Sequence, residues 1–181
     1  MSAIIKEIRN IETGVLEGYM YNQMHVPLDE ENEIYRLIQN WIAEGNQPEP
    51  AYTDEERLEY FKNKLLKEVK AITEARYQKS VIHSDTLDKD IDAGITALTN
   101  VDGLISILEN DDDTVEFRLA DNTFTEITKA ELEAIKKEII LAGQNLYKTK
   151  WAIEKQINAL DDVNDAIKAK IDFENAKLIT E

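Results

Sequence analysis

The chain contains no cysteine, and proline and glycine are scarce, at three and six among 181 residues. Without cysteine the chain can form no disulfide, no thiolate metal site and no cysteine nucleophile. Few glycines and prolines leave few tight turns, which favours helices over a turn-rich β-sandwich. These absences predict a fold that is rich in helix and has no covalent cross-links.

Basic residues are also in short supply, since 21 Lys and Arg stand against 37 Asp and Glu, for a net charge of −16. Nucleic acids and anionic membranes are bound by clusters of Lys and Arg. We therefore expect no nucleic-acid partner and no membrane partner. The excess of negative charge also keeps such a protein soluble.

Long apolar runs are missing as well, because no stretch reaches the roughly 18 residues that a membrane-spanning helix needs. The N-terminal residues, MSAIIKEIRNIETG, mix charged and apolar side chains, so we do not expect a signal peptide. The chain still has 43% hydrophobic residues, enough to bury a core. We expect a protein of the cytoplasm, or of a particle assembled there.

Hydrophobic periodicity predicts a mainly helical α+β protein with one β-hairpin and a small N-terminal β-like segment. Apolar residues at steps of three and four predict helices over 30–44, 54–81 and 129–160. The second and third of these begin at capping boxes, in which Thr53 or Thr128 precedes a glutamate by three residues. The apolar residues over 91–110 predict two short helices. Asp29 is the expected N-cap of the helix over 30–44.

The hairpin is predicted from an alternation near the middle of the chain. Val115, Phe117 and Leu119 alternate with Glu116 and Arg118, as in a strand with one buried face. A polar turn and a return strand to residue 127 follow. Phe117 and Leu119 should therefore be buried, while Glu116 and Arg118 face solvent.

The stiff segment NQPEP is the clearest candidate linker. It predicts a strand–helix module over 1–50, a long connecting helix over 51–82 and a C-terminal helix–hairpin–helix domain over 83–181. The helices beginning at Thr53 and Thr128 are long for a chain of this size, so we expect them to pack antiparallel. Their leftover apolar surface predicts contact with another chain and hence a homo-oligomer.

Chemical motifs do not appear in the sequence. Asp88, Asp90 and Asp92 have the spacing of a calcium loop, but its sixth position is Ala93 and its twelfth is Thr99. Phosphate loops, nucleophile elbows and zinc spacings are also missing. We therefore predict no catalytic residue, no metal ligand and no cofactor site.

Two blocks carry a family resemblance. The first consists of Val26-Pro27, Trp41, Glu44-Gly45-Asn46 and Pro48-Glu49-Pro50. The second consists of Ile95 to Leu108, Val115 to Leu119, Asp121-Asn122-Thr123-Phe124, Thr128 and Trp151. In this order the blocks resemble small tailed-phage proteins that are encoded with tail fibres, among them tail-fibre assembly proteins with a C-terminal phage domain of unknown function.

This resemblance implies a non-enzymatic bacteriophage protein, which acts as a fibre assembly chaperone or as a minor tail structural subunit. Its partner would be a tail-fibre or other tail protein, bound in the host cytoplasm during assembly or in the virion tail. The alternative is an acidic phage inhibitor of a host nucleic-acid-binding protein, which would mimic phosphate charge. Carboxylates gathered on one face would favour the inhibitor.

For partner binding we single out four residues beside apolar stripes of the predicted helices: Trp41, Ile42, Tyr147 and Trp151. Buried aromatic anchors are common energetic centres of protein interfaces. The alternative is that each tryptophan fills the core of its own chain.

Overall fold

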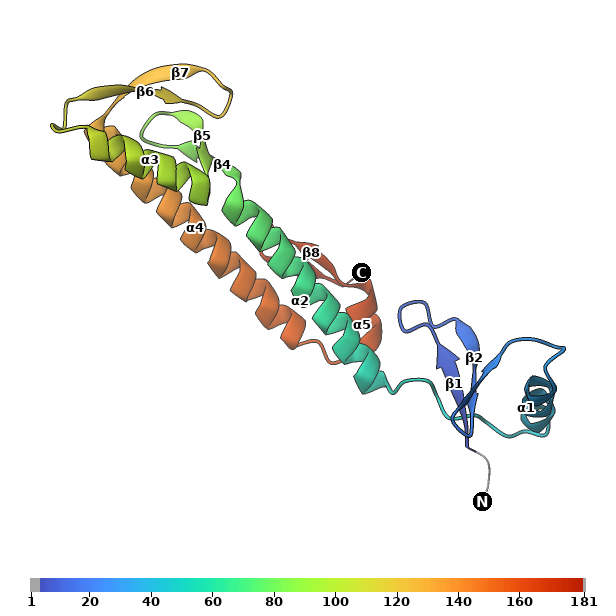
Figure 1. Ribbon diagram of the computed structural model, residues 1–181. Coiled ribbons are helices and arrows are strands. Elements are labelled where there is room, and N and C mark those ends of the chain that lie inside the picture. The colour runs from blue at the N-terminus through green and yellow to red at the C-terminus, as the bar shows by residue number, and fades with distance from the viewer. Residues whose placement is uncertain (1–3, 181) are drawn as a thin grey trace. The chain divides into compact units, whose positions relative to one another are not determined.

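The computed structural model describes residues 4–180, which form five helices and nine strands (Figure 1). They divide into two compact units, Met1–Phe61 and Lys62–Glu181, so the boundary lies inside the second helix. The helices are α1 (Glu33–Ala43), α2 (Asp54–Gln78), α3 (Ile95–Ile107), α4 (Lys129–Asn158) and α5 (Val163–Lys168). Among these residues, no helix combines the length and apolar character that crossing a membrane requires.

The prediction of a mainly helical chain with one hairpin is wrong, because several small antiparallel sheets accompany the helices. The first unit holds a three-stranded sheet of β1 (Ile5–Arg9), β2 (Leu16–Tyr21) and β3 (Met24–Pro27). The second unit holds three hairpins: β4 (Ser80–Ser84) with β5 (Lys89–Ala93), β6 (Thr114–Arg118) with β7 (Phe124–Thr128), and β8 (Lys170–Asp172) with β9 (Lys177–Ile179).

The two missed hairpins, β4–β5 and β8–β9, are short, and neither has a clear strand pattern in the sequence. β4 and β5 each have five residues, and β8 and β9 each have three. Three residues are too few to show an alternation, and in β4 the apolar residues Val81 and Ile82 are adjacent and so do not alternate. Asp88 and Ala176 take left-handed backbone angles in the two turns, with φ of 52° in each case.

Side-chain caps mark the starts of α1, α2 and α4. At α4, the Glu131 amide donates to Thr128 Oγ1 at 3.2 Å, and the Thr128 amide donates to Glu131 Oε2 at 2.7 Å. Thr53 and Glu56 cap α2 in the same way, so both predicted capping boxes are confirmed. The cap of α1 is Asn32, not Asp29, because Asn32 Oδ1 accepts from two amides of the first turn.

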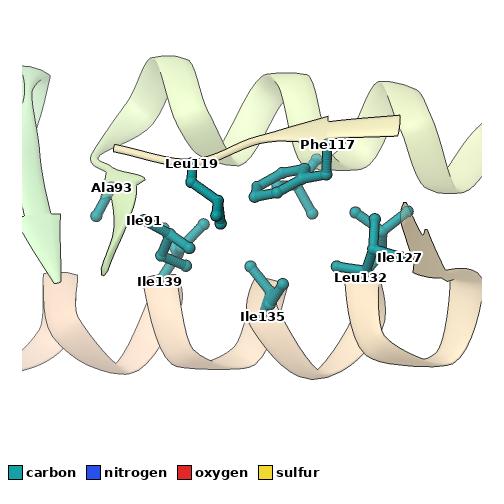
Figure 2. Close-up of a cluster of buried hydrophobic side chains, with 9 residues drawn as sticks. Ile91, Ala93, Phe117, Leu119, Ile127, Leu132, Ile135 and Ile139 are labelled. Atoms are coloured by element: carbon teal, nitrogen blue, oxygen red, sulfur yellow. The ribbon is translucent and has the colours of Figure 1, made fainter. Parts of the chain in front are cut away.

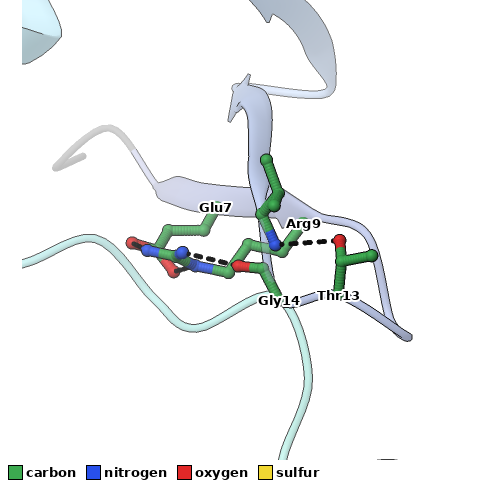
Figure 3. Close-up of polar contacts among 5 residues, drawn as sticks. Glu7, Arg9, Thr13 and Gly14 are labelled. Carbon is green, nitrogen blue, oxygen red and sulfur yellow. Dashed lines mark hydrogen bonds and ion pairs between the residues drawn. The ribbon is translucent and has the colours of Figure 1, made fainter.

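In the first unit, α1 packs against the three-stranded sheet. Its core contains Ile5, Tyr19, Val26 and Ile38. The outer edge of β1 is covered by the segment after α1, since the Glu7 amide donates to the Glu49 carbonyl at 2.8 Å. Beside it, Arg9 pairs with Glu7 and donates to the Gly14 carbonyl at 2.9 Å, which closes the β1–β2 turn (Figure 3).

In the second unit, α2 and α4 run antiparallel (Figure 1). Near one end of the pair, Lys62 Nζ donates to the Asn158 carbonyl at 3.0 Å. Further along, Val69 and Ile153 are buried in one cluster, and the last contact joins the rings of Tyr77 and Tyr147. This confirms the predicted antiparallel packing of the two long helices.

The N-terminal half of α4 serves a second core. Leu132, Ile135 and Ile139 pack there with residues of β5, α3 and the β6–β7 hairpin (Figure 2). Phe117 and Leu119 point into this core, whereas Glu116 and Arg118 are exposed, so the predicted alternation is confirmed.

The second core bears on the predicted homo-oligomer. We expected the unpaired end of a long helix to need another chain. Instead, α3 and two hairpins of the same chain cover the part of α4 that lies beyond α2. The homo-oligomer therefore stays a prediction, but the length of α4 no longer supports it.

Gly94, the N-cap of α3, lies against the end of α2. Its φ is +96°, an angle that side chains disfavour. A Cβ built there would lie 2.7 Å from the carbonyl oxygen of Tyr77 and 2.8 Å from that of Gln78. Gly94 therefore lets the start of α3 approach the end of α2 closely.

We predict that Gly94→Ala lowers the free energy of unfolding by about 2 kcal/mol or more, because it combines backbone strain with a clash against main-chain atoms. Gly103→Ala is the matched control, since Gly103 lies in α3 with open space around its Cα. The control should stabilise the helix by about 0.5–1 kcal/mol. Urea denaturation measures both, and equal effects of the two substitutions would contradict the close approach.

Candidate functional site

A groove of about 820 Å³ lies in the second unit, beside the middle of α4. The end of α2, the start of β4, the start of α3 and the β8–β9 turn form its other walls. This is the region of α4 between the two cores. Ile139 is the last α4 residue of one core and Ile153 is the first fully buried α4 residue of the other.

Small residues keep this region open. Ala142 and Gly143 interrupt the bulky apolar stripe of α4, and both line the groove. A Cβ on Gly143 would have the Tyr77 ring at 4.0 Å as its nearest neighbour, which is ordinary contact. Glycine inside a helix costs about 1 kcal/mol relative to alanine. The backbone conformation at position 143 therefore does not require glycine.

A row of aromatic rings crosses the groove. The rings of Tyr77 and Tyr147 meet edge to face with centroids 5.7 Å apart. Trp151 follows one helical turn later, 6.1 Å from Tyr147. The Trp151 side chain is 59% exposed, although a ring of this size is usually largely buried. Val81 and Ile140 also line the groove and are exposed.

An ion pair fixes one end of the groove. Arg76 Nη2 lies 2.6 Å from Glu174 Oε1, and its guanidinium stands 4.8 Å from the centre of the buried Phe173 ring. The cation–π contact and the ion pair together hold the β8–β9 turn against α2.

The structure brings together two of the four residues predicted for partner binding. Tyr147 and Trp151 both line the groove. Trp41 and Ile42 lie in the first unit, where they are partly buried against the core of sheet and α1. There the two side chains contribute to the packing of their own unit.

Sequence reasoning missed the opposite walls of the groove. Tyr77 and Val81 stand at the end of α2 and the start of β4, and Phe173 stands in a turn. Their spacing carries no signal, because only the pairing of α2 with α4 brings them near Trp151. Gly143 did offer a signal, since an isolated glycine in the interior of a long helix is unfavourable.

Within residues 4–180, no group of three or more His, Asp or Glu side chains could hold a metal ion. The acidic run Asp111–Asp113 has a structural role before β6, because Asp113 Oδ2 accepts from the amides of Glu109 and Asn110. His83 Nδ1 lies 3.1 Å from Asp90 Oδ1 on the exposed β4–β5 hairpin, and that hydrogen bond raises the pKa of His83.

Residues 61–175 match a family model described as a domain of unknown function (DUF4376). The chain belongs to this family. No curated protein and no solved structure matches the chain. Every residue that lines the groove lies within the segment matched by the DUF4376 model. The groove is therefore a feature of the DUF4376 domain and does not involve the sheet of the first unit.

Within the DUF4376 domain, Glu138 fastens the β4–β5 turn to α4. Its Oε1 accepts from the Thr86 amide at 3.0 Å and from the Thr86 hydroxyl at 2.7 Å. Burial acts to raise the pKa of Glu138, but the hydrogen bonds from Thr86 and the nearby Ser84 hydroxyl outweigh it and hold the pKa below its usual value. The ionised form is therefore the one that the folded domain prefers.

The sign of this shift predicts a pH dependence. A lowered pKa stabilises the fold fully above the ordinary value of 4.5, and the contribution is lost as pH falls from there through the folded-state pKa. Glu138→Gln should lower stability at neutral pH by roughly 1–2 kcal/mol. It should also remove part of the loss of stability below about pH 4.5.

Thermal melts at pH 7 and at several lower pH values measure both effects. The exposed Glu133 on the same helix provides the control substitution Glu133→Gln. Parallel pH profiles for the two variants would contradict the role of Glu138.

Proposed function

We propose that this protein is a non-enzymatic bacteriophage protein associated with tail fibres, and that it acts by binding another protein in the groove of its DUF4376 domain. It would serve as a fibre assembly chaperone or as a minor tail subunit. The phage part of this proposal rests on the resemblance of the two sequence blocks. The binding part rests on the groove.

One observation carries the binding proposal, which is the exposure of Trp151 beside Tyr147 and Tyr77. Aromatic residues are enriched in protein interfaces, and tryptophan and tyrosine are frequent energetic centres there. A partner that covers Trp151, Val81 and Ile140 would remove their apolar surface from water. Each Å² removed is favourable by about 25 cal/mol of free energy.

The charged groups of the groove favour binding over catalysis. Among the described lining residues, the one carboxylate is that of Glu174, which is paired with Arg76. Acid–base chemistry usually needs a titratable group free to exchange a proton with substrate. A lining of aromatic and aliphatic side chains is better suited to holding an apolar segment.

The alternative function is inhibition of a nucleic-acid-binding protein through phosphate mimicry. The salt dependence of partner binding distinguishes it from the function proposed above. Binding through the groove should weaken only modestly between low and high salt, because few charged groups line it. Binding through an array of carboxylates should weaken steeply as salt rises, because exposed charges are screened.

We predict that Trp151→Ala weakens capture of a tail-fibre protein by roughly 2 kcal/mol, or about thirtyfold. Its thermal melt should change little, since the side chain is largely exposed. Leu141→Ala is the matched control, because Leu141 is a similarly exposed apolar residue of α4, at 56%, but does not line the groove. Co-purification from infected cells and melting of the same samples give both quantities.

The outcome that would sink the proposal is unchanged capture per folded molecule with a large drop in melting temperature. Trp151 would then serve the stability of its own domain. Chaperone and tail subunit are distinguished separately, by whether the protein stays with purified particles or is lost after assembly.

A further inference from the structure

Charge is unevenly distributed along this acidic chain. The segment 136–155, which forms the middle and late part of α4, contains five Lys and two Glu, a local charge of +3, although the chain as a whole carries −16. The groove lies along this segment. An acidic partner should therefore meet less repulsion along this segment than over the rest of the chain.

One basic side chain that lines the groove is available to pair with a partner. Arg76 and Lys148 are its two basic lining residues, and Arg76 is engaged by Glu174. Lys150 and Lys136 pair with Glu154 and Asp102, respectively. Lys148 is exposed and makes no ion pair within residues 4–180. One turn of helix separates it from the exposed Trp151.

From this arrangement we propose that the groove selects a partner segment in which a large apolar side chain is flanked by carboxylates. The apolar side chain would stack on Tyr147 and Trp151, and a carboxylate would pair with Lys148. This inference rests on the proposed function, which it deepens by naming the chemistry of the partner. Charge complementarity of this kind contributes to specificity and to the rate of association.

The first experiment asks what the groove selects. A library of random 12-residue peptides, displayed on particles, is panned on the full chain and counter-selected on Trp151→Ala. We expect the enriched peptides to combine an aromatic or aliphatic residue with neighbouring Asp or Glu and to be poor in Lys and Arg. Enrichment of basic peptides, or of peptides with no acidic bias, would overturn the proposal.

The second experiment measures affinity at the groove. The chain has two tryptophans, so Trp41→Phe leaves Trp151 as the one reporter of fluorescence. Titration with the most enriched peptide should shift Trp151 emission and saturate. Lys148→Glu should weaken this binding about tenfold, because it replaces an attraction by a repulsion.

Lys137→Glu is the matched control, since Lys137 is exposed on the same helix, outside the groove lining, and the change in net charge is identical. We expect it to change the affinity less than about twofold. Equal losses in the two variants would mean that the general field of the chain, and not a contact at Lys148, attracts the peptide, which would overturn the proposal.

The failures of the two proposals can be told apart. If Trp151→Ala abolishes fibre capture but the selected peptides show no acidic bias, the binding function stands and the inference fails. If acidic peptides bind as expected but fibre capture ignores Trp151, the proposed function fails instead. Sedimentation of the chain without peptide adds a third outcome: a dimer that depends on Trp151 would assign the groove to a second copy and overturn the inference.

Discussion

The DUF4376 domain depends on the packing of the apolar stripe of α4. Its first half, with Leu132, Ile135 and Ile139, closes one core, and its last turns, with Ile153 and Ile157, close another. A helix of 30 residues extends for about 45 Å, more than one small core can cover. Splitting the stripe between two cores buries both ends and leaves the middle for the groove.

Local signals in the sequence were sufficient for the elements that have strong periodicity or a cap. The start of α4, the start of α2 and the inward direction of Phe117 all follow from a few neighbouring residues. The β4–β5 and β8–β9 hairpins did not, because they lack the clear alternation of β6 and gain their stability from tertiary packing. Ile91, for example, is fully buried by α4 and not by its own hairpin partner alone.

The residues of the candidate site also divide into those that the sequence indicates and those that only the fold brings together. Tyr147 and Trp151 could be found from the sequence, since two large aromatics one helical turn apart lie beside a stripe that is complete without them. Tyr77 and Phe173 could not, because they come from separate elements and reach the groove through the register of α2 against α4. Trp41 shows the limit of reasoning from residue type, since an identical side chain on α1 packs against its own sheet.

Sequence separation within the domain has a consequence for its synthesis. The hairpins pair close neighbours in the chain, whereas the bond from Lys62 to the carbonyl of Asn158 spans 96 residues. Contacts between neighbours form quickly, while distant pairings bear the entropy of closing a long loop. The groove draws its walls from positions as far apart as Arg76 and Glu174. A ribosome-bound chain can therefore form the β4–β5 and β6–β7 hairpins well before Glu174 has emerged, and the proposed binding in the groove would require synthesis past that residue.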